Sequence, residues 1–365
     1  MPESEYYKKL KEAVSKQEGL FNAHLHLDRA STLDEKFWEH AGINPVEASS
    51  YSLKAKQNLT GNLHLGSAYK KSSLLERMEE QLDLMISIGP KRADSFIDVS
   101  PDIGFVALDA ALELKEKKKN QIDFRIGAYP IFGFRDDIPE RWNVFLEGAK
   151  RADYIGTLPE RDDKKDHPNH IGFIEHFRRT LNLACELKKP IHYHVDQTNN
   201  PAENGTETLV DAVKWLGSPK IDEHPSVWAV HSISSSAYDE KRFQILLDNL
   251  NECNVGVICC PSAAISMRQL RPINAPTHNS IARILEMLAK EIPVRIGSDN
   301  VADIFLPSTT SDLYDEIFML SNSVRFYNTS IMTKLATGKE LNDVDREMIE
   351  RSLAQDKEIF GKLKI

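Results

Sequence analysis

Short apolar runs alternate with longer amphipathic stretches along most of this chain. From Leu20 onward, apolar runs of roughly four to seven residues alternate about eight times with amphipathic stretches of roughly ten to twenty. This alternation is typical of successive βα units around a parallel sheet. The apolar runs predict strands at 20–23, 95–99, 124–129, 154–158, 191–195, 227–231, 255–260 and 293–298.

The stretches between these strands have the spacing of amphipathic helices. In the first, Ser73 and Glu76 have the spacing of a capping box, and Gly89-Pro90 supplies a stop signal. The apolar residues of its predicted core face are Leu74, Leu75, Met78, Leu82 and Met85. Further helices are predicted at 105–115, 139–147, 171–187, 207–216, 238–250 and 281–290.

Eight parallel strands with intervening helices predict a (β/α)8 TIM-type barrel, whose chemistry lies at the C-terminal strand ends. Two further helical stretches, 330–335 and 342–360, should pack on its outside. No linker or repeat divides the chain, so we expect a single domain over 1–365, with the barrel core at about 20–330 and the C-terminal helices at about 330–365.

The segment between the first strand and its helix, residues 30–71, is far longer than an ordinary βα loop. It carries Gln57, Asn58 and His64. We interpret it as a lid or substrate wall, with a plain surface excursion as the alternative.

Composition narrows the class of partner. The sequence is 41% hydrophobic and 28% charged, with a formal net charge of -9. Nucleic-acid backbones and anionic membranes favour basic surfaces, so a small molecule is the expected ligand, and a homo-oligomer is compatible with the sequence. The polar N-terminus and the lack of long apolar stretches predict a cytoplasmic protein. The four cysteines have no disulfide or zinc-finger spacing.

Candidate chemistry begins with two histidines at the end of the first apolar run. His24 and His26 are two residues apart, so on a strand their side chains point to the same side. Both imidazoles can then reach one ion. A His-x-His pair on a solvated strand is also common by chance, so other strand ends must supply further ligands.

Three later strands also end in His or Asp. The fifth predicted strand carries His192 and His194, the sixth ends at His231, and Asp299 follows the eighth. Imidazole and carboxylate ligands suit one divalent ion, Zn²⁺ or Fe²⁺, with a position left open for water. His192 and His194 share one face of their strand and compete for the same position, and His194 lies nearer the C-terminal end.

These motifs resemble the amidohydrolase superfamily, in particular its cytosine-deaminase-like branch. The resemblance covers most of residues 20–330. It depends on His24-Leu25-His26-Leu27-Asp28, His194-Val195-Asp196, His231-Ser232 and Gly297-Ser298-Asp299, with a weaker match at Cys260-Pro261-Ser262.

The resemblance implies a site with assigned roles. His24, His26, His194 and Asp299 would bind one divalent metal. His231 would hydrogen-bond the metal-bound water or the substrate, and Asp299 would act as general base. Strand four has no lysine to bridge two ions, which favours a mononuclear site.

Two departures from the family pattern change the expected substrate. Where deaminases of this branch have a proton-shuttling glutamate, this chain has Gln197, which cannot titrate. Asp196 is a candidate substitute. After the third strand, Tyr129-Pro130-Ile131 has an apolar residue where cytosine deaminases present a glutamine, which makes cytosine an unfavourable substrate.

The start of the chain also resembles adenosine deaminases, which share His-x-His-Leu-Asp. Those enzymes lack the N-terminal β-sandwich of many relatives, and we expect none here because some twenty residues precede His24. Their His-Ala-Gly-Glu strand is absent, and Asn300 stands where they have a second aspartate.

We therefore expect an amidohydrolase that uses metal-activated water to cleave a C–N bond, other than a peptide bond, in an amide, amidine or amino substituent of a small cyclic or heteroaromatic molecule. Two alternatives remain: a nucleobase-type deaminase with an atypical proton shuttle, and an inactive barrel that binds small molecules. The expected catalytic residues are Asp299, His231 and Gln197. The expected substrate-binding residues are Tyr129, Asp196, Arg268 and Asn300.

Overall fold

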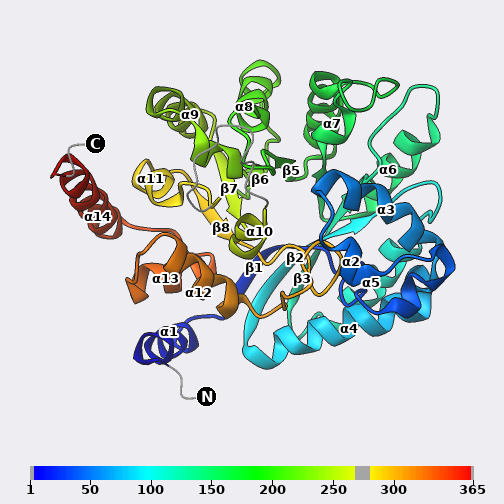
Figure 1. Ribbon diagram of the computed structural model, residues 1–365, viewed down its shortest axis with the longest axis horizontal. Coiled ribbons are helices and arrows are strands. Elements are labelled where there is room, and N and C mark those ends of the chain that lie inside the picture. Colours follow the sequence, from blue (N-terminus) through cyan, green and yellow to red (C-terminus); the bar gives the residue numbers. More distant parts are fainter. Residues whose placement is uncertain (1–3, 268–279, 363–365) are drawn as a thin grey trace.

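Eight parallel strands form one sheet in chain order, and the sheet curves into a nearly closed barrel (Figure 1). The computed structural model describes residues 4–267 and 280–362. The strands are β1 (Leu20–Leu25), β2 (Pro90–Asp98), β3 (Asp123–Tyr129), β4 (Tyr154–Thr157), β5 (Ile191–Val195), β6 (Val227–His231), β7 (Val255–Cys259) and β8 (Val294–Ile296). The predicted (β/α)8 barrel is confirmed.

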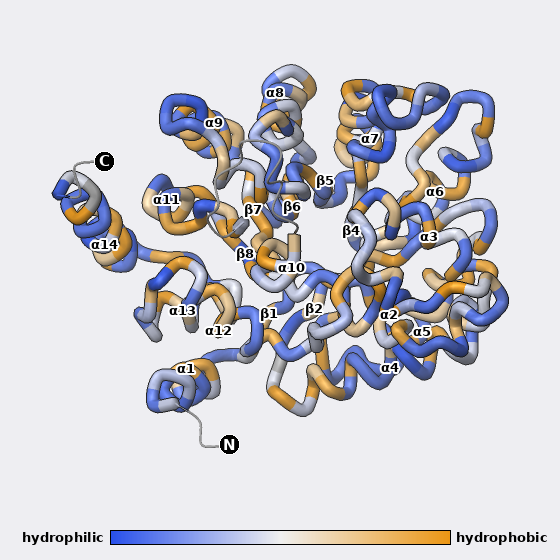
Figure 2. Tube along the Cα trace, in the orientation of Figure 1, coloured by the Kyte–Doolittle hydropathy of each residue, from blue (hydrophilic) through white to orange (hydrophobic). Residues whose placement is uncertain are grey.

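Helices follow the strands and cover the outside of the barrel. Along them, apolar and polar residues alternate at short intervals in Figure 2, as amphipathic packing on a sheet requires. They are α4 (Lys71–Ile88), α5 (Val106–Lys118), α6 (Glu140–Arg151), α7 (Phe173–Leu187), α8 (Gly205–Leu216), α9 (Glu240–Glu252) and α11 (Ile284–Ala289).

The capping box predicted for the first of these helices is wrong. The N-cap of α4 is Lys70, which makes no side-chain cap, and Ser73 lies inside the helix, where it accepts a hydrogen bond from Arg77. Gly89 ends the helix as predicted, in a left-handed conformation.

Two helices follow the barrel at the C-terminal end, as predicted. They are α13 (Thr329–Thr337) and α14 (Asp343–Lys362). Before them lie α10 (Pro261–Ser266) and α12 (Leu313–Ser323), which the sequence analysis missed, and near the start of the chain lies a third missed helix, α1 (Glu5–Ser15). Helix α1 packs against α13, and α14 packs against α11 (Figure 1).

The long segment after β1 is largely helical. It contains α2 (Pro45–Ala48), α3 (Leu53–Leu65) and three 3-10 turns, η1 (Glu35–Phe37), η2 (Glu39–Ala41) and η3 (Ser67–Tyr69). Leu53, Lys56 and Gln57 of α3 line the same pocket as three of the predicted metal ligands, His26, His194 and Asp299. The segment therefore forms one wall of that pocket.

The last strand meets the first through a close backbone contact. Asp299 donates its backbone N–H to the carbonyl oxygen of His24 at 2.9 Å, and His26 donates its N–H to the carbonyl of Asp299 at 3.3 Å. Gly297 permits this approach, because a Cβ there would lie 2.8 Å from the backbone nitrogen of His24 and 2.9 Å from its oxygen. Closing the barrel thus also brings predicted ligands together.

Within 4–267 and 280–362, no helix is both long and apolar enough to cross a membrane.

The Gly297 contact predicts a large effect for a single added methyl group. Gly297→Ala should lower the free energy of unfolding by about 2 kcal/mol or more, because the backbone of His24 must move. Urea unfolding measures this. The control is Gly361→Ala on α14, where a Cβ meets nothing within 4 Å and alanine should be neutral or slightly stabilising. Equal effects of the two substitutions would contradict the closure argument.

Candidate metal centre and substrate pocket

Four predicted ligands meet at the C-terminal end of the barrel. His24 lies in β1, His26 directly after it, His194 in β5 and Asp299 after β8. One potential ligand atom from each lies within 4.8 Å of all the others, and all four residues are buried. Strand alternation explains the first pair, and barrel closure explains why Asp299 joins it.

The donor distances fit a single small cation. The Nε2 atom of His194 lies 3.1 Å from Nε2 of His24 and 3.3 Å from Nε2 of His26. The Oδ1 atom of Asp299 lies 3.3 Å from the Nε2 atoms of both His24 and His26. Ligands bound tetrahedrally at about 2.0–2.1 Å stand roughly 3.3–3.4 Å apart, so these separations match a four-coordinate edge.

Protonation states at this cluster also suit ligation. Burial, followed by the charge of Arg29, lowers the pKa of His26 to about 3. Burial also holds the pKa of His194 well below its usual value. Burial alone would raise the pKa of Asp299, but hydrogen bonding to His24 and His26 outweighs it and lowers that pKa. At neutral pH, His26 and His194 are therefore neutral and the carboxylate is ionised, as metal ligation requires.

His231 stands beside the cluster at the end of β6. Its Nε2 atom lies 3.9 Å from Oδ2 of Asp299, and its Nδ1 atom is buried with no hydrogen-bond partner among the described residues. Burial lowers its pKa to about 4, so the ring is neutral near pH 7.

Strained backbone marks the strand ends that carry the site. Asp196, His231, Ser232 and Asp299 all have positive φ angles, between 48° and 78°. Side chains other than glycine rarely adopt this conformation, and it clusters at functional sites where the surrounding structure enforces it. Asp196, His231 and Ser232 end or directly follow a barrel strand, and Asp299 lies three residues after β8.

The competition between His192 and His194 has a clear structural outcome. The ring of His192 packs inside the barrel, 4.5 Å from the ring centroid of Tyr154 and 6.2 Å from that of Trp228. His194, two residues further along the strand, is the histidine that joins the cluster.

A pocket opens directly over the cluster, and most of the predicted site residues line it. Its lining includes His26, His194, Gln197, His231, Asp299, Asn300 and Tyr129. Apolar residues such as Ile131, Ala263 and Leu306 form other parts of the wall. The space between protein atoms here is about 490 Å³, which includes space open to solvent.

Two predicted substrate-binding residues stand apart. Asp196 accepts the backbone N–H groups of Gly205 at 2.6 Å and Thr206 at 2.8 Å, so it caps the start of α8 and does not line this pocket. Its proposed role as substitute proton carrier therefore has no support in its position. Arg268 lies outside the described residues.

Sequence reasoning missed two pocket residues that carry positive charge. Arg29 lines the pocket and contacts Nδ1 of His26, and its position directly after His-Leu-His-Leu-Asp was an available signal. Lys56 comes from α3 and donates to the carbonyl oxygen of Phe305 at 3.1 Å. No local pattern marks Lys56, because its role depends on where α3 docks.

Buried charges fasten the end of α3 to the barrel. His64 lies between two carboxylates, with Nε2 at 3.1 Å from Asp98 and Nδ1 at 2.8 Å from Asp102. Burial by itself would lower the pKa of His64, but hydrogen bonds to Asp102 and Asp98 outweigh it and raise the pKa to about 9. The imidazolium therefore holds the pocket wall in place.

The same network reaches the metal cluster. Asp98 lies 3.8 Å from the guanidinium of Arg29, which contacts His26. Tyr69 donates from its hydroxyl group toward Asp98 at 3.0 Å and Asp28 at 2.8 Å. The wall of the pocket and the candidate ligand His26 are thus linked through Asp98 and Arg29.

The fold has solved counterparts among deaminases. No family model matches the sequence. A 5-methylcytosine deaminase from Klebsiella pneumoniae, liganded with 5-fluorocytosine, superposes with a TM-score of 0.74 at 17% identity, covering 87% of this chain and 72% of that chain. The chain shares the barrel fold of this solved structure. The fold implied by the sequence motifs is therefore confirmed.

Other comparisons agree with this deaminase-like barrel. N-isopropylammelide isopropylaminohydrolase from Burkholderia multivorans gives a TM-score of 0.61 at 16% identity, over 87% of this chain and 72% of that chain. N6-methyl-AMP deaminase from Arabidopsis thaliana gives 0.58 at 13% identity, over 94% and 98%. An uncharacterised protein of Haemophilus influenzae is 28% identical over 282 residues, which are 76% of this chain and 94% of that protein.

The cluster geometry predicts which histidine of β5 holds a metal. His194→Asn should weaken zinc binding at least about 100-fold, since it removes a donor. His192→Asn is the matched control and should retain zinc affinity, because that ring lies among aromatic side chains inside the barrel. Competition with a chromophoric chelator measures both, and equal losses would contradict the assignment.

The anchor of α3 predicts a pH-dependent stability. The pKa of His64 is higher in the folded chain than its ordinary 6.5, so its contribution is complete below pH 6.5 and is lost as pH rises through about 9. The difference in unfolding free energy between the wild type and His64→Gln should therefore shrink between pH 7 and pH 10, by on the order of 3 kcal/mol.

Urea unfolding at the two pH values measures that difference. Ser67→Ala, a change without a titrating group in the same segment, should differ from the wild type by a constant amount. A His64→Gln difference that stays constant as well would show that His64 is uncharged in the fold.

Proposed function

We propose that this chain is a mononuclear metal-dependent hydrolase that cleaves a C–N bond of a small cyclic or heteroaromatic molecule. The observation that carries the proposal is the set of four buried ligand atoms at the mouth of a deaminase-like barrel. Four of the six separations between these atoms are 3.1–3.3 Å. Solved structures of this fold include deaminases and an isopropylaminohydrolase, whose names describe removal of an amino or alkylamino group.

His24, His26, His194 and Asp299 would hold one divalent ion, Zn²⁺ or Fe²⁺. Such an ion lowers the pKa of a water toward neutrality and polarises the bond under attack. The three imidazoles contribute no charge of their own, so the carboxylate of Asp299 is the anionic ligand.

Asp299 has two oxygens in different surroundings, which suits a double role. Oδ1 faces the imidazoles of His24 and His26, while Oδ2 faces His231 at 3.9 Å. With Oδ1 engaged as a ligand, Oδ2 would be free to accept a proton from the attacking water and to return it to the leaving nitrogen. Neutral His231 orients the water or the developing oxyanion through Nε2.

The pocket wall favours a compact ring as substrate. Tyr129 and Ile131 form one apolar face near the cluster, and Phe305 and Leu306 form another. Lys56 and Gln57 of α3, in the long segment after β1, supply polar groups to this pocket. We assign substrate contacts to Tyr129, Gln197 and Asn300 on this basis.

One observation favours a second function, binding without turnover. Gln197 occupies the place of the proton-carrying glutamate, and an amide cannot transfer a proton as a carboxyl does. A barrel of this kind would retain an unchanged ligand. The hydrolytic proposal is preferred because all four donors and His231 remain together.

The test is hydrolysis by protein reconstituted with zinc or ferrous iron. Amino-pyrimidines, triazines, purines, cyclic amidines and cyclic amides are assayed for release of ammonia, amine or ring-opened product. We expect turnover of at least one class, and His231→Gln should lower kcat/KM by about 100-fold because it removes one positioned proton-transfer or hydrogen-bonding group.

Metal content separates a chemical defect from loss of the site. His231→Gln should retain the metal of the wild type, since His231 is not among the four donors. A folded, metal-loaded wild type that turns over no compound and returns a bound ligand unchanged would support the binding function instead. A fully active protein without metal would overturn both the ligand assignment and the mechanism.

A further inference from the structure

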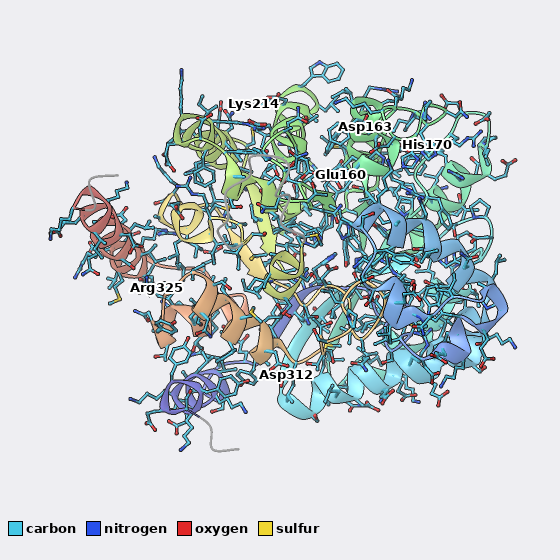
Figure 3. The ribbon with its side chains drawn as sticks, viewed as in Figure 1. Glu160, Asp163, His170, Lys214, Asp312 and Arg325 are labelled. Atoms are coloured by element: carbon cyan, nitrogen blue, oxygen red, sulfur yellow. The ribbon has the colours of Figure 1, made fainter. Side chains whose placement is uncertain are left out.

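Gln197 is held at its nitrogen end by a carboxylate. Its Nε2 atom donates to Oε2 of Glu160 at 2.6 Å, and Oε1 of Glu160 accepts the backbone N–H of Asp196 at 2.7 Å. Glu160 lies in the 3-10 turn Pro159–Asp162 between β4 and α7, and Figure 3 labels it at that position. Both carboxylate oxygens are therefore engaged by donors from two consecutive residues.

Asn300 is held in the same way on another strand. Its Nδ2 atom donates to Oδ2 of Asp303 at 2.5 Å. Oδ1 of Asp303 accepts the backbone N–H groups of Phe305 at 2.7 Å and Leu306 at 3.0 Å. Here too, backbone donors fix one oxygen of the carboxylate and the amide takes the other.

An ionised carboxylate only accepts hydrogen bonds, so beside ionised Glu160 and Asp303 each amide turns its NH2 group toward its carboxylate and its carbonyl oxygen away. Burial raises the pKa of both carboxyls, well above its usual value for Glu160 and to about 6 for Asp303, and a protonated carboxyl would allow the amide to turn. Gln197 and Asn300 both line the pocket over the metal cluster. Among the described residues, neither side-chain carbonyl oxygen accepts a hydrogen bond. Both residues are more than nine-tenths buried, at 6% and 5% exposure.

The two carbonyl oxygens also flank the metal cluster along the chain. Gln197 follows the ligand His194 by three residues, and Asn300 directly follows the ligand Asp299. A ring placed with its reacting carbon at the cluster would therefore meet one fixed acceptor beyond β5 and another beyond β8.

We propose that this pocket recognises rings that present two N–H donors beside the reacting carbon, as cyclic ureas and protonated cyclic amidines do. The proposal rests on the proposed function for the meaning of "reacting carbon", and it names the substrate class of that site. Glu160 and Asp303 are positioning residues, because each acts through the amide that it orients.

This recognition explains why a glutamine can stand at position 197. A ring with a bare nitrogen beside its reacting carbon needs a proton donor there, and the carbonyl of Gln197 has none to give. A ring that already carries N–H needs an acceptor, which the carbonyl supplies. A pocket that leaves a buried acceptor unpaired rejects a ligand lacking the donor.

A methylation series on one ring tests the proposal without a known substrate. The probes are tetrahydropyrimidin-2-one, a six-membered cyclic urea with two N–H groups, and its N-methyl and N,N'-dimethyl derivatives. Binding to the zinc-loaded protein is measured by ligand-observed NMR titration. We expect affinity to fall about tenfold with each N–H removed.

A ring methylated on carbon controls for the added volume. The 5-methyl derivative keeps both N–H groups and should bind within about threefold of the parent. Equal affinities for the parent and the N,N'-dimethyl ring overturn the proposal, as does a lack of binding by the whole series. Tighter binding of the methylated rings would show that the amide nitrogens face the pocket, which also overturns it.

Two isosteric variants test the positioning role. Glu160→Gln and Asp303→Asn replace a carboxylate by a group that both donates and accepts, so the pocket amide is free to turn. Each should reduce the tenfold step for one N–H to about threefold or less while the 5-methyl control is unchanged. Glu207→Gln, a carboxylate on α8 that pairs with Arg242, is the matched control and should keep the full discrimination.

The series separates this proposal from the hydrolase proposal, because it measures binding. Discrimination among the rings with no turnover of any compound would refute the hydrolase and retain the donor-recognising pocket. Turnover of a heteroaromatic ring with equal binding across the series would refute the donor-recognising pocket and retain the hydrolase. The titration is repeated on the metal-free protein, so failure to bind zinc cannot conceal the result.

Discussion

The backbone contact between β1 and the segment that follows β8 is the constraint on which the candidate site depends. The backbone hydrogen bonds between Asp299 and the His24–His26 segment fix the carboxylate beside two imidazoles. Only a residue without a side chain fits at Gly297, where the two strands approach most closely. Barrel closure and assembly of the metal cluster are thus one structural event, and the strained φ of Asp299 belongs to the same contact.

A second layer of interactions holds the groups around this contact. On one side, Arg29 and Asp98 connect His26 to His64, and through it to the helical wall of the pocket. On the other, Glu160 and Asp303 orient the amides of Gln197 and Asn300. The buried carboxylates Asp98, Glu160 and Asp303 each have several hydrogen-bonding or charged partners. Networks of this kind give a site a definite geometry.

Much of the fold could be predicted because its signals are local. The strand at 227–231 is buried along its whole length and begins with four continuous apolar residues, and His24 and His26 reveal their common side by spacing alone. The Ser73 capping box failed because Lys70 and Lys71 begin the helix one turn earlier. Helices α1 and α12 were missed although Asp312 is an N-cap with a visible sequence pattern. The expectation of a single domain over 1–365 stays a prediction.

The finer parts of the site could not be predicted because they join residues far apart in sequence. Nothing near Gln197 indicates that Glu160 lies against it, and nothing near Lys56 indicates that α3 faces the cluster. Asp196 carried a misleading signal, since its place after a candidate ligand suggested substrate contact while its carboxylate caps α8.

Closure of the barrel has a further consequence for how the chain folds. The candidate ligands His24 and Asp299 are separated by nearly the whole barrel sequence, so their contact is among the most non-local in the molecule and joining them costs much chain entropy. The proposed metal site is complete only once the segment after β8 has docked on β1, so metal uptake would report closure of the barrel.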